Sequence, residues 1–222
     1  MKNSYFLTIF LFTSCIFFNS CVKKKQTQDQ NKVLSQDLIN ENLSEVKLNS
    51  DDVPLTYHPI NVDKTILEWI GKKTTGTHNG TVKISKGVLG INQNGEIVNG
   101  KFKINMEDIQ CDDLTGSKKE SIETHLKDED FFNTQEYPEA NFTITNIDGK
   151  KIIGVLTIKD ISKEINFEYV QKNDLEYTAE IIVNRTLFDI KYKSKTFFPE
   201  LGDHFIHDDF IIKLNPLVIS PK

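Results

Sequence analysis

NGEIVNGKFKINM, residues 94–106, is the stretch that decides the fold. Asn94-Gly95 is the strongest hairpin signal in the chain, because both residues accept the positive φ of a tight turn. After it, apolar residues alternate with Asn and Lys from Ile97 to Met106. This is the period of a strand that buries one face. The stretch therefore predicts an antiparallel hairpin with one face in a core.

The same rhythm continues on both sides of this stretch, from about Tyr57 to Pro216. Short runs rich in β-branched and aromatic residues are bounded by turn dipeptides, as in antiparallel sheets. Asp148-Gly149 and Asn173-Asp174 each separate two such runs and predict two more hairpins.

One segment departs from the strand pattern, between Ser117 and Lys127. Ser117 and Glu120 have the spacing of a capping box, and Ile122, His125 and Leu126 follow at helical spacing. We expect one short helix here. About eight or nine antiparallel strands with one helix predict an all-β fold, a closed barrel or a sandwich. We favour the barrel, because closure removes exposed sheet edges.

The first 21 residues have the features of a bacterial lipoprotein signal. Lys2 precedes an apolar run, and Ser20-Cys21 follows it. The run is short and interrupted by polar residues, so it does not fit a membrane-spanning helix, which needs about 20 apolar residues; a plain signal peptide would need no Cys at position 21. We therefore expect residues 1–21 to be a lipoprotein signal with Cys21 as the lipid attachment site. Residues 22–56 are polar and lack a packing core, which predicts a flexible tether, and residues 57–222 would form the barrel domain.

Charge and cysteine content exclude two other classes. The chain has a net charge of −5, and the part after residue 21 has 26 basic and 32 acidic side chains without a basic stripe. This disfavours nucleic acid as a partner. Cys111 is the single cysteine after residue 21, so no disulfide within the domain can hold it together, and a hydrophobic core has to do so.

Five spaced motifs resemble one known family. They are WIGKKTTGTHNG (residues 69–80), IETHLKDEDFF (122–132), YPEANF (137–142), GVLTIKDISK (154–163) and RTLFDIKY (185–192). In this order, over nearly all of residues 61–218, the chain resembles the YceI-like proteins, periplasmic lipocalin-like domains that bind polyisoprenoid and related lipids. In the family pattern the last motif lies on a strand. Asp160 stands where the family commonly has Gly, and Asn184 where it has Asp.

The resemblance implies an extended eight-stranded antiparallel barrel, lipocalin-like, whose apolar interior takes one hydrocarbon chain. Residues with suitable spacing to point inward are Trp69, Val82, Ile84, Phe102, Ile104, Phe142, Ile144, Leu156, Ile158, Phe167, Ile182 and Phe188. Those expected to contact the ligand are Trp69, Phe102, Phe142, Ile158, Phe167 and Phe188. The alternative is that these residues simply pack a solid core, which the same alternation would also produce. His78, His125 and Arg185 are expected either to bind a polar head group or to fix the fold.

Motifs of catalysis and metal binding are missing. The chain has no nucleophile elbow, HExxH, Walker loop, dinucleotide fingerprint or CxxC, so we expect no enzyme and no cofactor. His204 and His207 lie beside Asp208 and Asp209, but on an extended strand residues three apart point to opposite faces, so we expect no metal site.

The sequence thus predicts non-enzymatic binding of an isoprenoid or another long-chain lipid by a membrane-tethered lipoprotein that faces the periplasm. The alternative is a ligand-free interaction or stress-protection module with a packed core.

Overall fold

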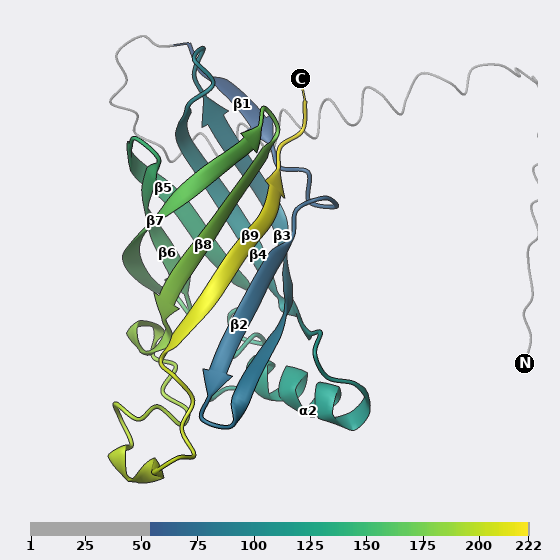
Figure 1. The fold of residues 1–222 in the computed structure, drawn as a ribbon, viewed down its shortest axis with the longest axis vertical. Helices are drawn as coiled ribbons and strands as arrows, with labels where there is room; N and C mark the ends of the chain where they lie inside the picture. The colour runs from purple at the N-terminus through teal and green to yellow at the C-terminus, as the bar shows by residue number, and fades with distance from the viewer. Residues whose placement is uncertain (1–53, 222) are drawn as a thin grey trace, which may run out of the picture.

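Antiparallel strands close into a barrel with one short helix at one end (Figure 1). The computed structural model describes residues 54–221. The predicted signal, Cys21 and the predicted tether up to residue 53 lie outside the described residues. The strands are β1 (Thr56–Pro59), β2 (Leu67–Lys73), β3 (Gly76–Ile91), β4 (Ile97–Cys111), β5 (Glu139–Asp148), β6 (Lys151–Ile158), β7 (Ile161–Asn173), β8 (Glu176–Asn184) and β9 (Asp209–Val218).

The nine segments make an eight-stranded barrel because β1 and β2 share one position. The barrel order is β3-β2-β9-β8-β7-β6-β5-β4, and β4 pairs back onto β3. β2 pairs with the first half of β3 and β1 with its second half. Directly after β1, Ile60 bridges to Ile219, just beyond β9, and the Asn61 N–H donates to the carbonyl of Val218, the last residue of β9. β1 and β2 therefore lie end to end along β3 and count as one barrel strand. The predicted eight-stranded antiparallel barrel is confirmed.

The hairpin predicted at Asn94-Gly95 forms, but its loop is longer than expected. β3 and β4 pair up to Ile91 and Ile97, which leaves five residues in the loop. Gly95 alone of the two has positive φ, at 79°. The Asn92 carboxamide accepts hydrogen bonds from the backbone N–H groups of Asn94 and Glu96. A side chain that bonds its own backbone in this way replaces the tight turn that the dipeptide predicted.

The other hairpins have two-residue turns. β5 and β6 meet at Gly149 and Lys150, and β7 and β8 meet at Asp174 and Leu175; each turn lies one residue after the predicted dipeptide. β6 and β7 are joined by Lys159 and Asp160, with φ of 51° and 57°. Two successive left-handed residues are typical of a type I′ turn, which favours Asn-Gly. The turn therefore forms without the glycine that is common at position 160 in the family.

The predicted helix is present as α2 (Gly116–Lys127), although the predicted capping box is not formed. Thr115 is the N-cap residue, and no side chain caps the helix with a hydrogen bond. The chain enters the helix through Gly116 with φ of 58°. Ser117 therefore lies inside the first turn of the helix, two residues after the N-cap position, and cannot cap it. α2 packs against β4 at one end of the barrel, here called the α2 end; β1 and the C-terminus lie at the other, the β1 end (Figure 1).

The segment expected to continue as a strand after β8 is instead the 3₁₀ helix η1 (Arg185–Phe188), and η2 (Pro199–Leu201) follows in the loop before β9. The β7–β8 ladder covers only Tyr169 to Asn173 on β7. Below it the two strands are not paired, and η1 contacts β7 there. Phe188 of η1 is fully buried.

Side chains alternate along the strands as predicted, with one error among the residues expected to point inward. Ile182 is 65% exposed, whereas Ile181 and Val183 are buried. Successive side chains of a strand point to opposite faces, so Ile182 lies on the outside of β8. Within residues 54–221, no helix combines the length and apolar character needed to cross a bilayer.

Candidate functional site: an apolar cavity in the barrel

An apolar cavity of about 190 Å³ lies inside the barrel. All eight barrel strands contribute lining side chains, and so do α2 and the residues after it. Five of the six residues expected to contact a ligand line it, namely Trp69, Phe102, Phe142, Ile158 and Phe167. Phe188 is not among the lining residues, because η1 buries it in the core beside β7.

Three phenylalanines form one wall of the cavity. The rings of Phe102 and Phe142 stack with centroids 6.2 Å apart, and Phe142 and Phe167 are 5.7 Å apart. Trp69 also lines the cavity, and its indole N–H donates to the carbonyl of Gln110 at 2.9 Å. Because that polar group is satisfied on the barrel wall, the ring offers the cavity an apolar surface.

The β1 end of the cavity is closed. Leu89, Ile97 and Leu217 line it there and are buried. The rings of Tyr169 and Tyr177 lie 6.0 Å apart beside them. Burial raises the pKa of both hydroxyls, so both tyrosines remain neutral.

The α2 end of the cavity reaches solvent. Gly71 and Ile206 line it and are half-buried, and His207 lines it and is exposed. Leu126 of α2 and Phe131 close part of this end. The opening therefore lies between the end of β2 and the loop that precedes β9, and we call it the mouth.

Arg185 lies at the mouth but is engaged with backbone groups. It is buried, and its guanidinium donates to the carbonyls of His207, Ile190 and Ile206 at 3.1, 2.8 and 3.0 Å. A further bond reaches the Asp208 carboxylate at 3.4 Å. Burial lowers the pKa of Arg185, and Asp208 opposes that effect. These contacts tie the loop before β9 to the end of β8, which is the fold-fixing role.

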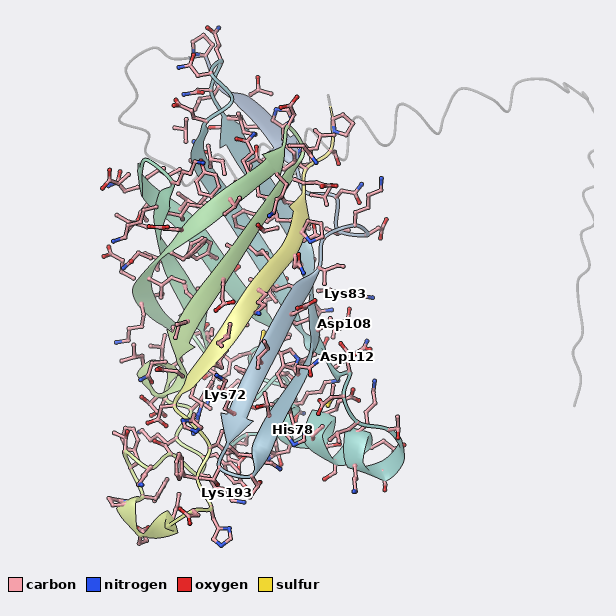
Figure 2. All side chains as sticks on the ribbon, viewed as in Figure 1. Lys72, His78, Lys83, Asp108, Asp112 and Lys193 are labelled. Carbon is pink, nitrogen blue, oxygen red and sulfur yellow. The ribbon has the colours of Figure 1, made fainter. Side chains whose placement is uncertain are left out.

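The other two polar residues of the prediction do not line the cavity. The His78 ring lies near the α2 end (Figure 2) and donates to the Asp113 carboxylate at 2.8 Å. Asp113 also accepts from the Asn79 N–H and the Cys111 thiol. Burial alone would raise the pKa of Asp113, but these hydrogen bonds outweigh it and lower the pKa to about 2. Burial and the contact with Asp113 raise the pKa of Cys111, so its thiol is held protonated and unreactive.

His125 packs between rings below the mouth. Its ring centroid is 4.3 Å from that of Tyr192 and 5.4 Å from that of Phe131. Its Nδ1 lies 3.6 Å from Asp130, and its buried Nε2 has no hydrogen-bond partner within residues 54–221. Nor does this part of the chain contain three or more His, Cys, Asp or Glu residues placed to hold a metal ion.

Sequence reasoning missed several lining residues. Leu126, Phe131 and Phe132 line the cavity, although the sequence interpretation treated them only as part of a family motif. Tyr169 and Tyr177 were also missed. Tyr169 lies two residues after Phe167 on β7, and Tyr177 lies two residues before Ala179 on β8. Inward positions repeat every second residue, so this period could have identified both.

An eight-stranded antiparallel barrel that encloses an apolar cavity belongs to the class of β-barrels able to hold one small ligand. The model of the YceI-like domain family matches residues 59–216, and the chain belongs to this family. A UPF0312 protein of Staphylococcus aureus (strain USA300) is 35% identical over 82 residues, which are 34% of this chain and 48% of that protein. The chain thus spans about half the length of the curated relatives it matches.

Two solved structures share the fold. BcnA of Burkholderia cenocepacia has a TM-score of 0.55 at 18% identity, over 72% of this chain and 99% of BcnA. A polyisoprenoid binding domain from Saccharophagus degradans, implicated in plant cell wall breakdown, has a TM-score of 0.50 at 12% identity, over 76% of this chain and 100% of that domain.

Proposed function

We propose that the protein binds one long-chain, isoprenoid-like amphiphile in the barrel cavity and catalyses no reaction. The observation that carries this proposal is the continuous apolar cavity with an aromatic wall, closed at the β1 end and open at the mouth. An apolar cavity of about 150 Å³ already stays dry and binds small apolar molecules. The polyisoprenoid binding domain of S. degradans, which shares the fold, supports the same ligand class.

A binding role also agrees with the chemistry of the lining. Among residues 54–221, no carboxylate side chain lines the cavity. Arg185 is the one lysine or arginine that does, and the loop carbonyls hold its guanidinium. General acid–base catalysis needs a titratable group within hydrogen-bond reach of the reacting atoms. Besides Arg185, the titratable side chains that line the cavity are two tyrosines, whose hydroxyls burial keeps neutral, and His207, which lies at the exposed mouth and not in the interior. An uncharged hydrocarbon chain is therefore the best match.

The proposal includes the cellular setting. Cys21 would carry the lipid anchor after removal of the signal, and the barrel would face the periplasm from a membrane. More than one acyl chain makes such anchoring stable, since each buried methylene contributes about 0.8 kcal/mol.

The test uses the full chain with Cys21→Ser, purified without detergent and examined by native mass spectrometry and organic extraction. We expect a copurified long-chain lipid. Ala140 lines the cavity, so Ala140→Phe should fill it and abolish the lipid. The control Ile182→Phe adds a ring on the outside of β8 and should retain the lipid. The proposal fails if no lipid is found in the parent or if both variants retain it equally.

A further inference from the structure

Two loop segments at the mouth are rich in lysine and aromatic residues. IKYKSKTFFP (residues 190–199) has three lysines, three aromatic residues and no acid, and KKTTGT (72–77) has two lysines and no acid. Ile206 forms bridges with both Lys73 and Ser194, so the two segments lie on either side of it. We call the resulting surface the basic–aromatic rim; its residues are Lys72, Lys73, Lys191, Lys193, Lys195, Phe197 and Phe198.

The rim exposes two adjacent aromatic rings beside lysines. Phe197 is 44% and Phe198 41% exposed. The Lys191 ammonium lies 5.2 Å from the centroid of the Phe197 ring. Exposed apolar groups rimmed by polar residues mark protein or membrane contacts. Rings beside lysines are typical of the membrane interface, where the rings enter the headgroup region and lysines attract anionic lipid.

The two rim segments themselves carry basic charge and no acid. Five lysines gather on the rim of a chain whose net charge is −5. Of the nearby acids, Asp189 is paired with Lys191 and Asp208 with Arg185. Glu200 and Asp203 lie in the loop between the rim and β9, and Glu129, Asp130 and Glu136 line a groove on one side of the rim. Figure 2 shows Lys72 and Lys193 at the α2 end.

The rim also surrounds the mouth of the cavity. Gly71 and Ile206 line the mouth. Lys72 directly follows Gly71, and Ile206 bridges to both rim segments. We propose that the basic–aromatic rim docks on the surface of an anionic bilayer and places the mouth of the cavity against the lipid.

Anchorage at Cys21 is compatible with this docking. Residues 22–55 span at most about 120 Å when extended, whereas the 16 residues of β3 measure about 53 Å. A chain anchored at Cys21 can therefore turn the α2 end towards the same membrane. The docking is separate from ligand binding and can fail while ligand binding holds.

The experiment uses the full chain with Cys21→Ser and vesicles of phosphatidylserine and brominated phosphatidylcholine. Trp69 is the single tryptophan, and it lines the cavity. Phe198→Trp adds a reporter on the rim, and Val98→Trp adds one at the β1 end as a matched control, since Val98 is 36% exposed. We expect bromine quenching of the added tryptophan at 198 and none at 98. Quenching at 98 alone, at both sites equally, or at neither would overturn the proposal.

Charge reversal on the rim gives the second arm. Lys193→Glu with Lys195→Glu should raise the vesicle concentration for half-maximal quenching at 198 at least about twentyfold. Each lysine lost from the surface accounts for a factor of about five. Lys150→Glu with Lys151→Glu, at the β1 end, should leave it unchanged; equal effects of the two pairs would show that the rim is not the docking surface. Quenching of Trp69 in the parent reports brominated lipid in the cavity, so failure of ligand binding is read separately from failure of docking.

Discussion

Phe102→Ala tests whether the barrel interior is a ligand cavity or a packed core. A fully packed Phe loses about 3–5 kcal/mol of stability when truncated to Ala. Phe102 lines the cavity and stacks on Phe142, so part of its ring faces empty space and makes no dispersion contacts there. We expect a smaller loss of about 2–3 kcal/mol. Phe188→Ala is the matched control: this ring is fully buried and outside the cavity lining, so it should lose the full 3–5 kcal/mol.

The assay is equilibrium urea unfolding of both variants, with and without an isoprenoid alcohol such as farnesol. A ligand at 100 times its Kd should stabilise the parent by about 2.7 kcal/mol. It should also reduce the loss in Phe102→Ala, because the bound chain can fill the space left by the ring. The loss in Phe188→Ala should not change. Equal losses in the two variants, both insensitive to the ligand, would refute a ligand cavity.

Three further predictions concern other parts of the molecule. Asp113→Asn should lower the free energy of unfolding by about 1–2 kcal/mol at pH 7, after allowance for partial exposure of the carboxylate. Because the folded pKa of about 2 lies below the ordinary 3.8, this contribution is complete above about pH 4 and disappears towards pH 2, so urea unfolding of parent and variant should converge there. Lys159→Asn with Asp160→Gly should raise the melting temperature in a thermal scan, since two left-handed residues with side chains cost about 1–2 kcal/mol each; an unchanged or lower value would contradict the turn assignment. Cys21→Ser should move the protein from the membrane to the soluble periplasmic fraction or leave it unprocessed, whereas Cys15→Ser should not; Cys21→Ser protein that stays in the membrane with its signal cleaved would show that the anchor assignment is wrong.

The strands, the hairpins and the helix could be predicted because each has a local signal. Alternation from Ile97 to Met106 reflects a strand with one buried face, and helical spacing of Ile122 and Leu126 reflects a different period. Details that depend on which of several local contacts forms, or on contacts distant in sequence, could not be predicted. Asn92 replaced the turn expected at Asn94-Gly95 through its own backbone contacts. On β8 the alternation was misread: Tyr177, Ala179, Ile181 and Val183 are its apolar positions, and Ile182 is in phase with the polar ones.

The candidate site was predictable only in part for the same reason. Alternation identifies inward residues such as Trp69 and Phe167, but a solid core and a hollow barrel use the same alternation. Phe188 has the inward spacing of a strand residue, yet the chain turns into η1 where the β7–β8 ladder ends. Arg185 was expected to bind a head group or to fix the fold, and only its contacts with the loop carbonyls distinguish these roles.

The hollow interior has a physical cause in glycines that face the aromatic wall. A Cβ added at Gly154 would lie 2.5 Å from Cζ of Phe142, and one at Gly87 would lie 2.9 Å from Cδ1 of Phe102. Both distances are too short for real contacts, so each ring rests directly on the backbone of a neighbouring segment and lies along the wall. An eight-stranded barrel is just wide enough to be filled by its side chains, and rings held at the wall leave its axis empty.

Gly154→Ala should therefore push the Phe142 ring towards the axis and reduce the cavity volume, without changing which residues face inward. It should also lower stability, because the same Cβ would lie 2.6 Å from the backbone oxygen of Thr143. A crystal structure of the variant and its content of copurified lipid measure the two effects. An unmoved ring and an unchanged cavity would show that Phe142 is held at the wall by something other than the space above Gly154.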